Sequence, residues 1–234
     1  MEVPFTELKS FKQDVIKMDA TLAETEMTNT SIVLAGAFTP ALHHPQWYQS
    51  LGVLSGAELE EALSQIALSP FSTTFSWGTF TISCTPQQWA IITSSPDENE
   101  RVIQITKRFL ETGALSILAV GYNYISHVKT GKENILSAMD AGLALNRFGP
   151  DDASLQRCSL TLGRKSGIGF MTIKLEPSVT ASSRIFVSVN IELKKEEIGA
   201  RVADLGLFVE EQFATFEAAA RREIGKIALL VEGW

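Results

Sequence analysis

The sequence predicts an α+β protein of two antiparallel sheet-plus-helix units with a long C-terminal helix. The first observation is an apolar pattern near the C-terminus with steps of three and four residues that repeat every eleven. Such a pattern keeps one helix face apolar and nearly straight. The second observation is a series of short apolar runs with strand-like alternation, and the third is a linker signal at 148–152. The repeated apolar positions are Val202, Leu205, Val209, Phe213, Phe216, Ala220, Ile224, Ile227 and Val231.

Composition narrows the classes of function that the chain can have. A net charge of −7 and a pI near 5.1 disfavour a general nucleic-acid binder, whose surface is usually basic. The sequence shows no secretory signal and no apolar run long enough to span a membrane, so we expect a cytoplasmic protein. Cys84 and Cys158 each lie in a strand-like run and are predicted to be buried free thiols. We expect no cofactor and no metal site.

Residues 1–30 are a polar lead-in, in which apolar residues at near-helical spacing indicate a possible short helix. A strand is predicted over 31–38, followed by an irregular segment over 39–52 because Pro40 and Pro45 restrict the backbone. A helix should begin after Ser55, since Glu58 three residues later completes a capping box.

The rest of the first unit, 31–148, is predicted from alternation and helix-end signals. Strands are expected over 71–84 and 88–94, with a bulge or a turn at Gly78 where the alternation changes parity. A helix over 97–113 and a strand over 114–127 follow. The resulting order, β-α-β-β-α-β, is that of a ferredoxin-like unit, and a further helix is expected over 130–146.

The second unit, 149–234, is predicted to be a three-stranded meander followed by the long helix. The strands are expected over 155–162, 168–175 and 183–193, and the last of them shows the clearest alternation. Its residues Ile185 to Leu193 should alternate between core and solvent. The helix is expected from about residue 197 to residue 231.

Two segments contain candidate functional side chains. Adjacent His43 and His44, close to Trp47 and Tyr48, are candidates for a general base, a metal ligand or a binding site, but the favoured interpretation is a loop that packs its aromatic residues on the core. Arg164 and Lys165 lie in a glycine-rich segment without Walker spacing, which indicates a hairpin turn. The alternative is a contact with an anion, including a nucleic-acid phosphate.

The C-terminal helix also carries a second apolar row, Phe208, Ala219 and Leu230, at the same eleven-residue step. Two rows can serve two surfaces, the sheet of the chain itself and another helix. The leading hypothesis is therefore a non-enzymatic protein that acts by self-assembly, as a homo-oligomer, or by binding a partner protein. The alternatives are a hydrolytic or nucleotide-related enzyme that uses His43 or His44 in a pocket between the units, and an anion or nucleic-acid binder that uses Arg164 and Lys165.

Overall fold

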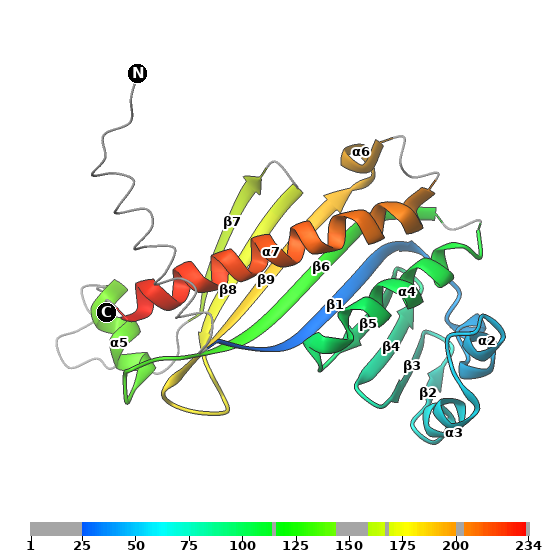
Figure 1. The fold of residues 1–234 in the computed structure, drawn as a ribbon, viewed down its shortest axis with the longest axis horizontal. Helices are drawn as coiled ribbons and strands as arrows, with labels where there is room; N and C mark the ends of the chain where they lie inside the picture. The colour runs from blue at the N-terminus through cyan, green and yellow to red at the C-terminus, as the bar shows by residue number, and fades with distance from the viewer. Residues whose placement is uncertain (1–24, 114–115, 144–158, 167–168, 200–203, 233–234) are drawn as a thin grey trace.

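The computed structural model describes residues 25–113, 116–143, 159–166, 169–199 and 204–232. Figure 1 shows an antiparallel sheet crossed by a long C-terminal helix. The strands are β1 (Thr25–Ala37), β2 (Ala67–Ser69), β3 (Ser72–Trp77), β4 (Phe80–Thr85), β5 (Gln88–Thr93), β6 (Ser116–Lys129), β7 (Leu160–Ser166), β8 (Gly169–Pro177) and β9 (Arg184–Lys194).

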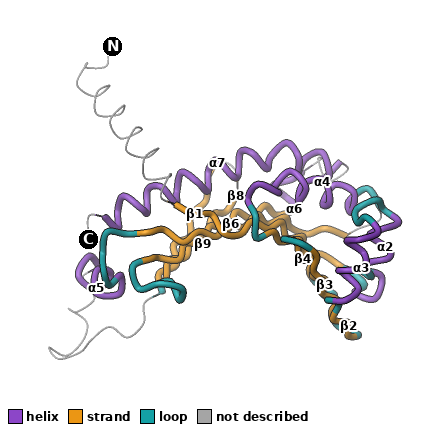
Figure 2. Tube along the Cα trace, turned by 60° about the horizontal axis from the view of Figure 1, so that its bottom comes forward, coloured by secondary structure: helices purple, strands orange, loops and turns teal. Residues whose placement is uncertain are grey.

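The longest helix in the described part of the chain is the C-terminal one, and it lies on the same side of the sheet as the helix that precedes β6 (Figure 2). The helices are α2 (Pro45–Ser50), α3 (Gly56–Ser64), α4 (Asn99–Leu110), α5 (Ile135–Leu143), α6 (Lys195–Ile198) and α7 (Leu205–Glu232), with short 3₁₀ turns η1 (Pro40–Leu42) and η2 (Pro96–Glu98).

The strands of both halves belong to one sheet. In the described residues its order is β2-β3-β4-β5-β1-β6-β9-β8-β7. The two long strands β1 and β6 pair antiparallel at its centre, from Thr25 opposite Val128 to Ala37 opposite Ser116. Two separate sheets are therefore not confirmed. The division of the chain near residue 149 stays a prediction, and the linker at 148–152 lies outside the described residues.

The ferredoxin-like form of the first half also stays a prediction. The sheet does contain the neighbours β4-β5-β1-β6. However, β3 and β2 extend it beyond β4, and β9 continues it beyond β6, so these four strands do not form a sheet of their own.

The core lies between the sheet and the helices that cover one of its faces. Strand β9 alternates as expected, with Ile185, Val187, Val189, Ile191 and Leu193 buried. Alternate residues on the helix-covered face of the other strands are mostly large and apolar. The opposite face carries many small and polar residues, among them Thr74, Thr81, Ala35, Asn123 and Asn190.

Several local predictions are confirmed or refined. The capping box at the start of α3 is present, because Ser55 and Glu58 exchange side-chain and backbone hydrogen bonds. The expected strand over 71–84 is a hairpin of β3 and β4 that turns at Gly78, whose φ is 50°. The segment 39–52, expected to be irregular, contains helix α2 because Pro45 occupies its first turn, where a missing N–H costs nothing.

The long C-terminal helix is confirmed, but it begins at Leu205 rather than near residue 197. The short helix α6 ends at Gly199, whose positive φ of 60° terminates a helix without steric cost. The possible helix in the lead-in and Cys158 lie outside the described residues, whereas Cys84 is a buried free thiol as predicted.

The apolar face of α7 packs on the centre of the sheet. Phe216 lies 4.3 Å from Tyr122 of β6, measured between ring centroids, and Phe213 contacts both Tyr122 and Tyr124. Near its N-terminal end, α7 packs against α4, where Lys107 and Glu210 form an ion pair at 2.6 Å. This arrangement leaves the C-terminal half of α7 above β8 and β7, at one edge of the sheet (Figure 1).

Candidate functional site

A groove lies between the C-terminal half of α7 and the strands β7 and β8. Its volume is about 200 Å³. Two of its apolar side chains are half exposed, Leu162 of β7 at 50% and Leu230 of α7 at 54%, while Ile173 and Ile227 lie buried at its floor. The groove is lined by Leu162, Gly163, Arg164, Ile173, Glu223, Lys226, Ile227 and Leu230.

A buried carboxylate forms ion pairs with the two basic side chains that line this groove. Glu223 of α7 is 5% exposed and forms ion pairs with Arg164 of β7 at 2.7 Å and Lys226 at 2.8 Å. Burial alone would raise the pKa of Glu223, but the hydrogen bonds and charges of Lys226 and Arg164 outweigh it and hold the pKa below its ordinary value. Glu223 is therefore an anion at neutral pH.

The charges around Glu223 do not cancel. One carboxylate faces two cations within hydrogen-bonding distance, and the Arg222 guanidinium lies 3.9 Å away. Lys165, the next residue of β7, is also exposed, and the sequence of β7 contains no acidic residue. In a chain with a net charge of −7, this edge is locally basic. It can attract an anionic group next to an apolar one.

Strand β7 is also at the edge of the sheet. It pairs with β8 from Leu160 opposite Leu175 to Ser166 opposite Gly169, and no described strand pairs with its other side. An edge strand presents backbone N–H and C=O groups that a further strand can bind. The groove, the excess positive charge and the edge of β7 thus lie together.

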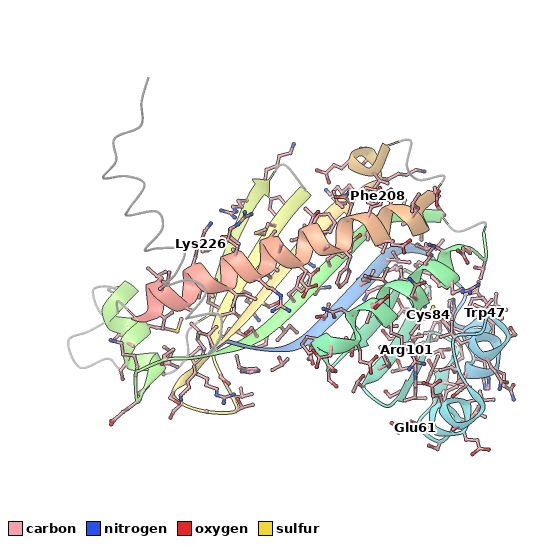
Figure 3. The ribbon with its side chains drawn as sticks, in the orientation of Figure 1. Trp47, Glu61, Cys84, Arg101, Phe208 and Lys226 are labelled. Atoms are coloured by element: carbon pink, nitrogen blue, oxygen red, sulfur yellow. The ribbon has the colours of Figure 1, made fainter. Side chains whose placement is uncertain are left out.

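The two predicted binding segments lie far apart. Trp47 belongs to α2 at one end of the molecule, and Lys226 belongs to the C-terminal half of α7, toward the other end (Figure 3). The structure therefore brings Arg164 together with Leu230, two residues that the sequence placed in different hypotheses. It does not bring either of them to His43 or His44.

His43 is a core residue. It is 4% exposed, and its Nδ1 lies 2.8 Å from the hydroxyl of Tyr48, which accepts a hydrogen bond from Trp89 Nε1 at 2.7 Å. Burial lowers the pKa of His43 to about 4, so the ring is neutral at neutral pH. Rings of Phe38, Trp47, Tyr48 and Phe109 surround it. This enclosure supports the structural interpretation of His43 rather than a base that meets a substrate.

The neighbours of His43 are structural as well. His44 accepts a weak hydrogen bond from the backbone N–H of Gln46 and so caps α2. Trp47 is half-buried against Tyr48, with ring centroids 4.9 Å apart, and Tyr48 is fully buried. The described part of the chain contains no group of three or more histidine, cysteine or acidic side chains placed to hold a metal ion.

The second apolar row of the long helix is not one exposed surface. Phe208 and Ala219 are buried within the chain itself, at 8% and 3% exposure, whereas Leu230 is exposed. Their role in contacting a second molecule stays a prediction, and of the three only Leu230 is exposed in the chain itself. Phe208 belongs to the end of α7 that packs against α4, and Leu230 belongs to the end that overhangs the groove.

A second hollow, of about 340 Å³, lies on the uncovered face of the sheet above β1, β6 and β9. Its small floor residues include Ala35, Ala119 and Gly121. The amide of Asn190 donates to Asn123, which donates to Ser31 Oγ at 3.1 Å. These polar groups mainly satisfy one another across three strands, so the hollow offers fewer free contacts than the groove.

Sequence reasoning identified Arg164 and Leu230 but missed Glu223, Lys226 and Leu162. A signal for Glu223 was present, because it lies between Ala220 and Ile224 and directly next to the apolar seam. A charged residue at that position must find a partner, and Lys226 three residues later is a suitable one. The contribution of Leu162 depends on strand order, which the sequence does not contain.

Comparisons with known proteins add no family to this description. No protein-family model matches the chain, and no curated protein matches it in sequence. Among the helices of the described residues, none combines the length and the apolar character that crossing a bilayer requires.

Proposed function

We propose that this chain is a non-enzymatic protein that binds a partner protein through the groove between β7, β8 and α7. The observation that carries the proposal is the position of Glu223, which holds Arg164 and Lys226 beside two half-exposed leucines. Arginine is enriched among the residues that contribute most to protein interfaces, and exposed apolar side chains rimmed by polar ones are typical of interaction sites.

A partner protein fits this edge better than a second copy of the chain. Symmetric antiparallel pairing of two β7 strands about Gly163 would place the Arg164 side chains of both copies at diagonally neighbouring positions on one face, and β7 has no acidic residue to offset them. Like charges in such a contact are destabilising. The anion-binding hypothesis for Arg164 and Lys165 is retained here as the polar part of a protein contact.

The enzymatic alternative receives no support from His43, because its ring is enclosed by aromatic side chains and is neutral at neutral pH. A non-enzymatic function therefore remains the proposal, and assembly of the chain with itself is an outcome that the test distinguishes.

The test compares affinity capture by the wild-type chain, the double variant Leu162→Ser/Leu230→Ser and the matched control Leu42→Ser/Leu68→Ser. All four leucines are at least half exposed, but Leu42 and Leu68 lie far from the groove. We expect one protein to be retained by the wild type and the control and lost from the groove variant. Retention of the same proteins by all three chains overturns the proposal.

Light scattering of the same three chains tests the self-assembly alternative. A wild-type mass of twice the chain, reduced to the chain mass in the groove variant alone, would show that the groove binds a second copy and would overturn the partner proposal. A wild-type monomer supports it.

A further inference from the structure

The side chains of β7 define two faces with different chemistry. Leu160, Leu162 and Arg164 lie on the helix-covered side, since Arg164 reaches Glu223 of α7, whereas Thr161 and Lys165 alternate to the other side. A strand added beside β7 would continue this alternation. Every second side chain of that strand would then project toward the groove and Leu230.

The chemistry of the groove is ordered along β7. Leu162 offers an apolar contact, and Arg164, two residues later, offers a cation that shares Glu223 with Lys226. Two residues along a strand span roughly 6.6 Å. The complementary segment therefore has a bulky apolar residue and an acidic residue two positions apart.

The backbone of β7 has the groups that such a strand needs. Ser166 pairs with Gly169 across a two-residue connection, which is the position of a hydrogen-bonded pair in a short hairpin. The alternation of antiparallel pairs then turns the amides of Thr161, Gly163 and Lys165 away from β8. No described strand of this chain pairs with that side.

We propose that an extended, acidic segment of a partner protein adds to β7 as a further strand, placing an apolar side chain in the groove beside Leu162 and a carboxylate beside Arg164. This inference rests on the function proposed above and specifies how the partner binds. Charge complementarity selects this occupant: the groove holds more positive than negative charge at Glu223, and β7 itself adds Lys165.

The test uses a fluorescein-labelled heptapeptide, Thr-Leu-Thr-Glu-Thr-Leu-Thr, with both ends blocked, and fluorescence anisotropy with the full chain. Two matched peptides carry lysine in place of the glutamate, or N-methyl groups on alternate amides. We expect the first peptide to bind and each matched peptide to bind at least about tenfold more weakly, because each loses a charge-assisted or backbone hydrogen bond.

Protein variants locate the binding. Leu162→Ser and Arg164→Gln should weaken binding of the glutamate peptide about tenfold or more, whereas Leu68→Ser and Lys174→Gln should leave it unchanged. Lys174 is a suitable control because it lies on β8, is exposed and pairs with Glu176 outside the groove. Hydrogen exchange should slow at Thr161, Gly163 and Lys165 when the peptide binds.

Three results would overturn the inference. No change in the anisotropy of the labelled peptide up to about 1 mM protein excludes recognition of this segment. Equal binding of the N-methylated peptide excludes strand addition. Slow exchange of the β7 amides before peptide is added means that the chain covers its own edge. If the partner from the capture experiment still needs Leu162 and Leu230, the proposed function stands while strand addition fails, so the two failures are distinguishable.

Discussion

His43 and Glu223 are two buried titratable side chains whose surroundings drive their charges in opposite directions. Aromatic rings and one tyrosine hydroxyl enclose His43, which therefore stays neutral. Glu223 has two cations within hydrogen-bonding distance and stays charged. Burial of the residue is similar in the two cases, so the partners decide the outcome.

We predict that His43 makes the free energy of unfolding fall as the solution is acidified. An unfolded histidine takes up a proton near pH 6.5, whereas folded His43 takes one up near pH 4. Within this window the unfolded state binds more protons, so stability rises with pH, with a slope of at most about 1.4 kcal/mol per pH unit. Urea unfolding at several pH values measures this slope. The variant His43→Gln should flatten it and His44→Gln should not. An equal slope in all three chains contradicts the assignment.

We predict that Glu223→Gln lowers the free energy of unfolding at neutral pH by about 1–2 kcal/mol, because charge-assisted hydrogen bonds from Arg164 and Lys226 are lost. The control Glu217→Gln removes an exposed pair with Arg221 on the same helix and should cost less than about 0.5 kcal/mol. The urea midpoints of the two variants measure this difference.

The folded pKa of Glu223 is depressed, so its contribution to the free energy of unfolding is present above pH 4.5 and is lost on further acidification. Equal losses of unfolding free energy in the two variants would mean that the ion pairs of Glu223 do not stabilise the groove more than an exposed pair does.

At the scale of single residues, the sequence indicated which side chains can make polar contacts better than it indicated which residues they contact. An anion contact of Arg164 was only the alternative to a hairpin turn, and the anion that Arg164 meets in the chain is Glu223. The pair joins β7 to α7 across about 60 residues of sequence, so no local pattern reveals it. His43 and His44 are adjacent in sequence, but one is buried against Tyr48 and the other caps a helix.

At the scale of elements, periodicity predicted most strands and helices because each has one buried face. Strand β9 and helix α7 are the clearest cases, since their apolar positions match the residues buried in the structure. The prediction was less accurate for the residues at which helices begin and end, because single glycines and prolines set these positions. Gly199 ends α6 and separates it from α7, and Pro45 begins α2 in a segment that two prolines had marked as irregular.

We predict opposite effects for two glycine-to-alanine substitutions in different elements. A Cβ at Gly36 of β1 would lie 2.3 Å from the carbonyl oxygen of Ser116, so Gly36→Ala should destabilise the protein by about 1–3 kcal/mol. A Cβ at Gly56, the first residue of α3, meets no atom within 4 Å, so Gly56→Ala should be neutral or stabilising by up to about 1 kcal/mol. Thermal unfolding followed by circular dichroism measures both. Stability losses of the same size would mean that β1 and β6 tolerate a larger separation at this point.

At the scale of the whole molecule, the pairing of β6 with β9 makes the two halves of the chain parts of one sheet. Strand order could not be predicted from the sequence, because periodicity says which face of a strand is buried and not which strand lies beside it. For the same reason, the groove was not predictable. Its residues come from three elements whose proximity follows from the position of β7 at the edge and of α7 across β8.

We predict that the chain unfolds in urea as one cooperative unit. Tryptophan fluorescence reports on the surroundings of Trp77 and Trp89, which are buried in the first half, and far-UV circular dichroism reports on both halves. The fluorescence and the circular dichroism should therefore change at the same urea concentration. The variant Gly36→Ala should shift both transitions together, because it acts on β6 from the first half and β6 in turn pairs with β9 of the second half. Separate transitions would instead indicate two units that fold independently.

The central position of β1 also has a consequence for synthesis on the ribosome. Strand β1 is made first, and its neighbours β5 and β6 follow in that order, with α4 between them. When β5 has paired, one edge of the thirteen-residue β1 is still open, and it stays open until residues 116–129 leave the exit tunnel. At elongation rates of about 5–20 residues per second, this interval lasts for seconds. The nascent chain is therefore exposed to edge-to-edge aggregation in the interval before β6 emerges.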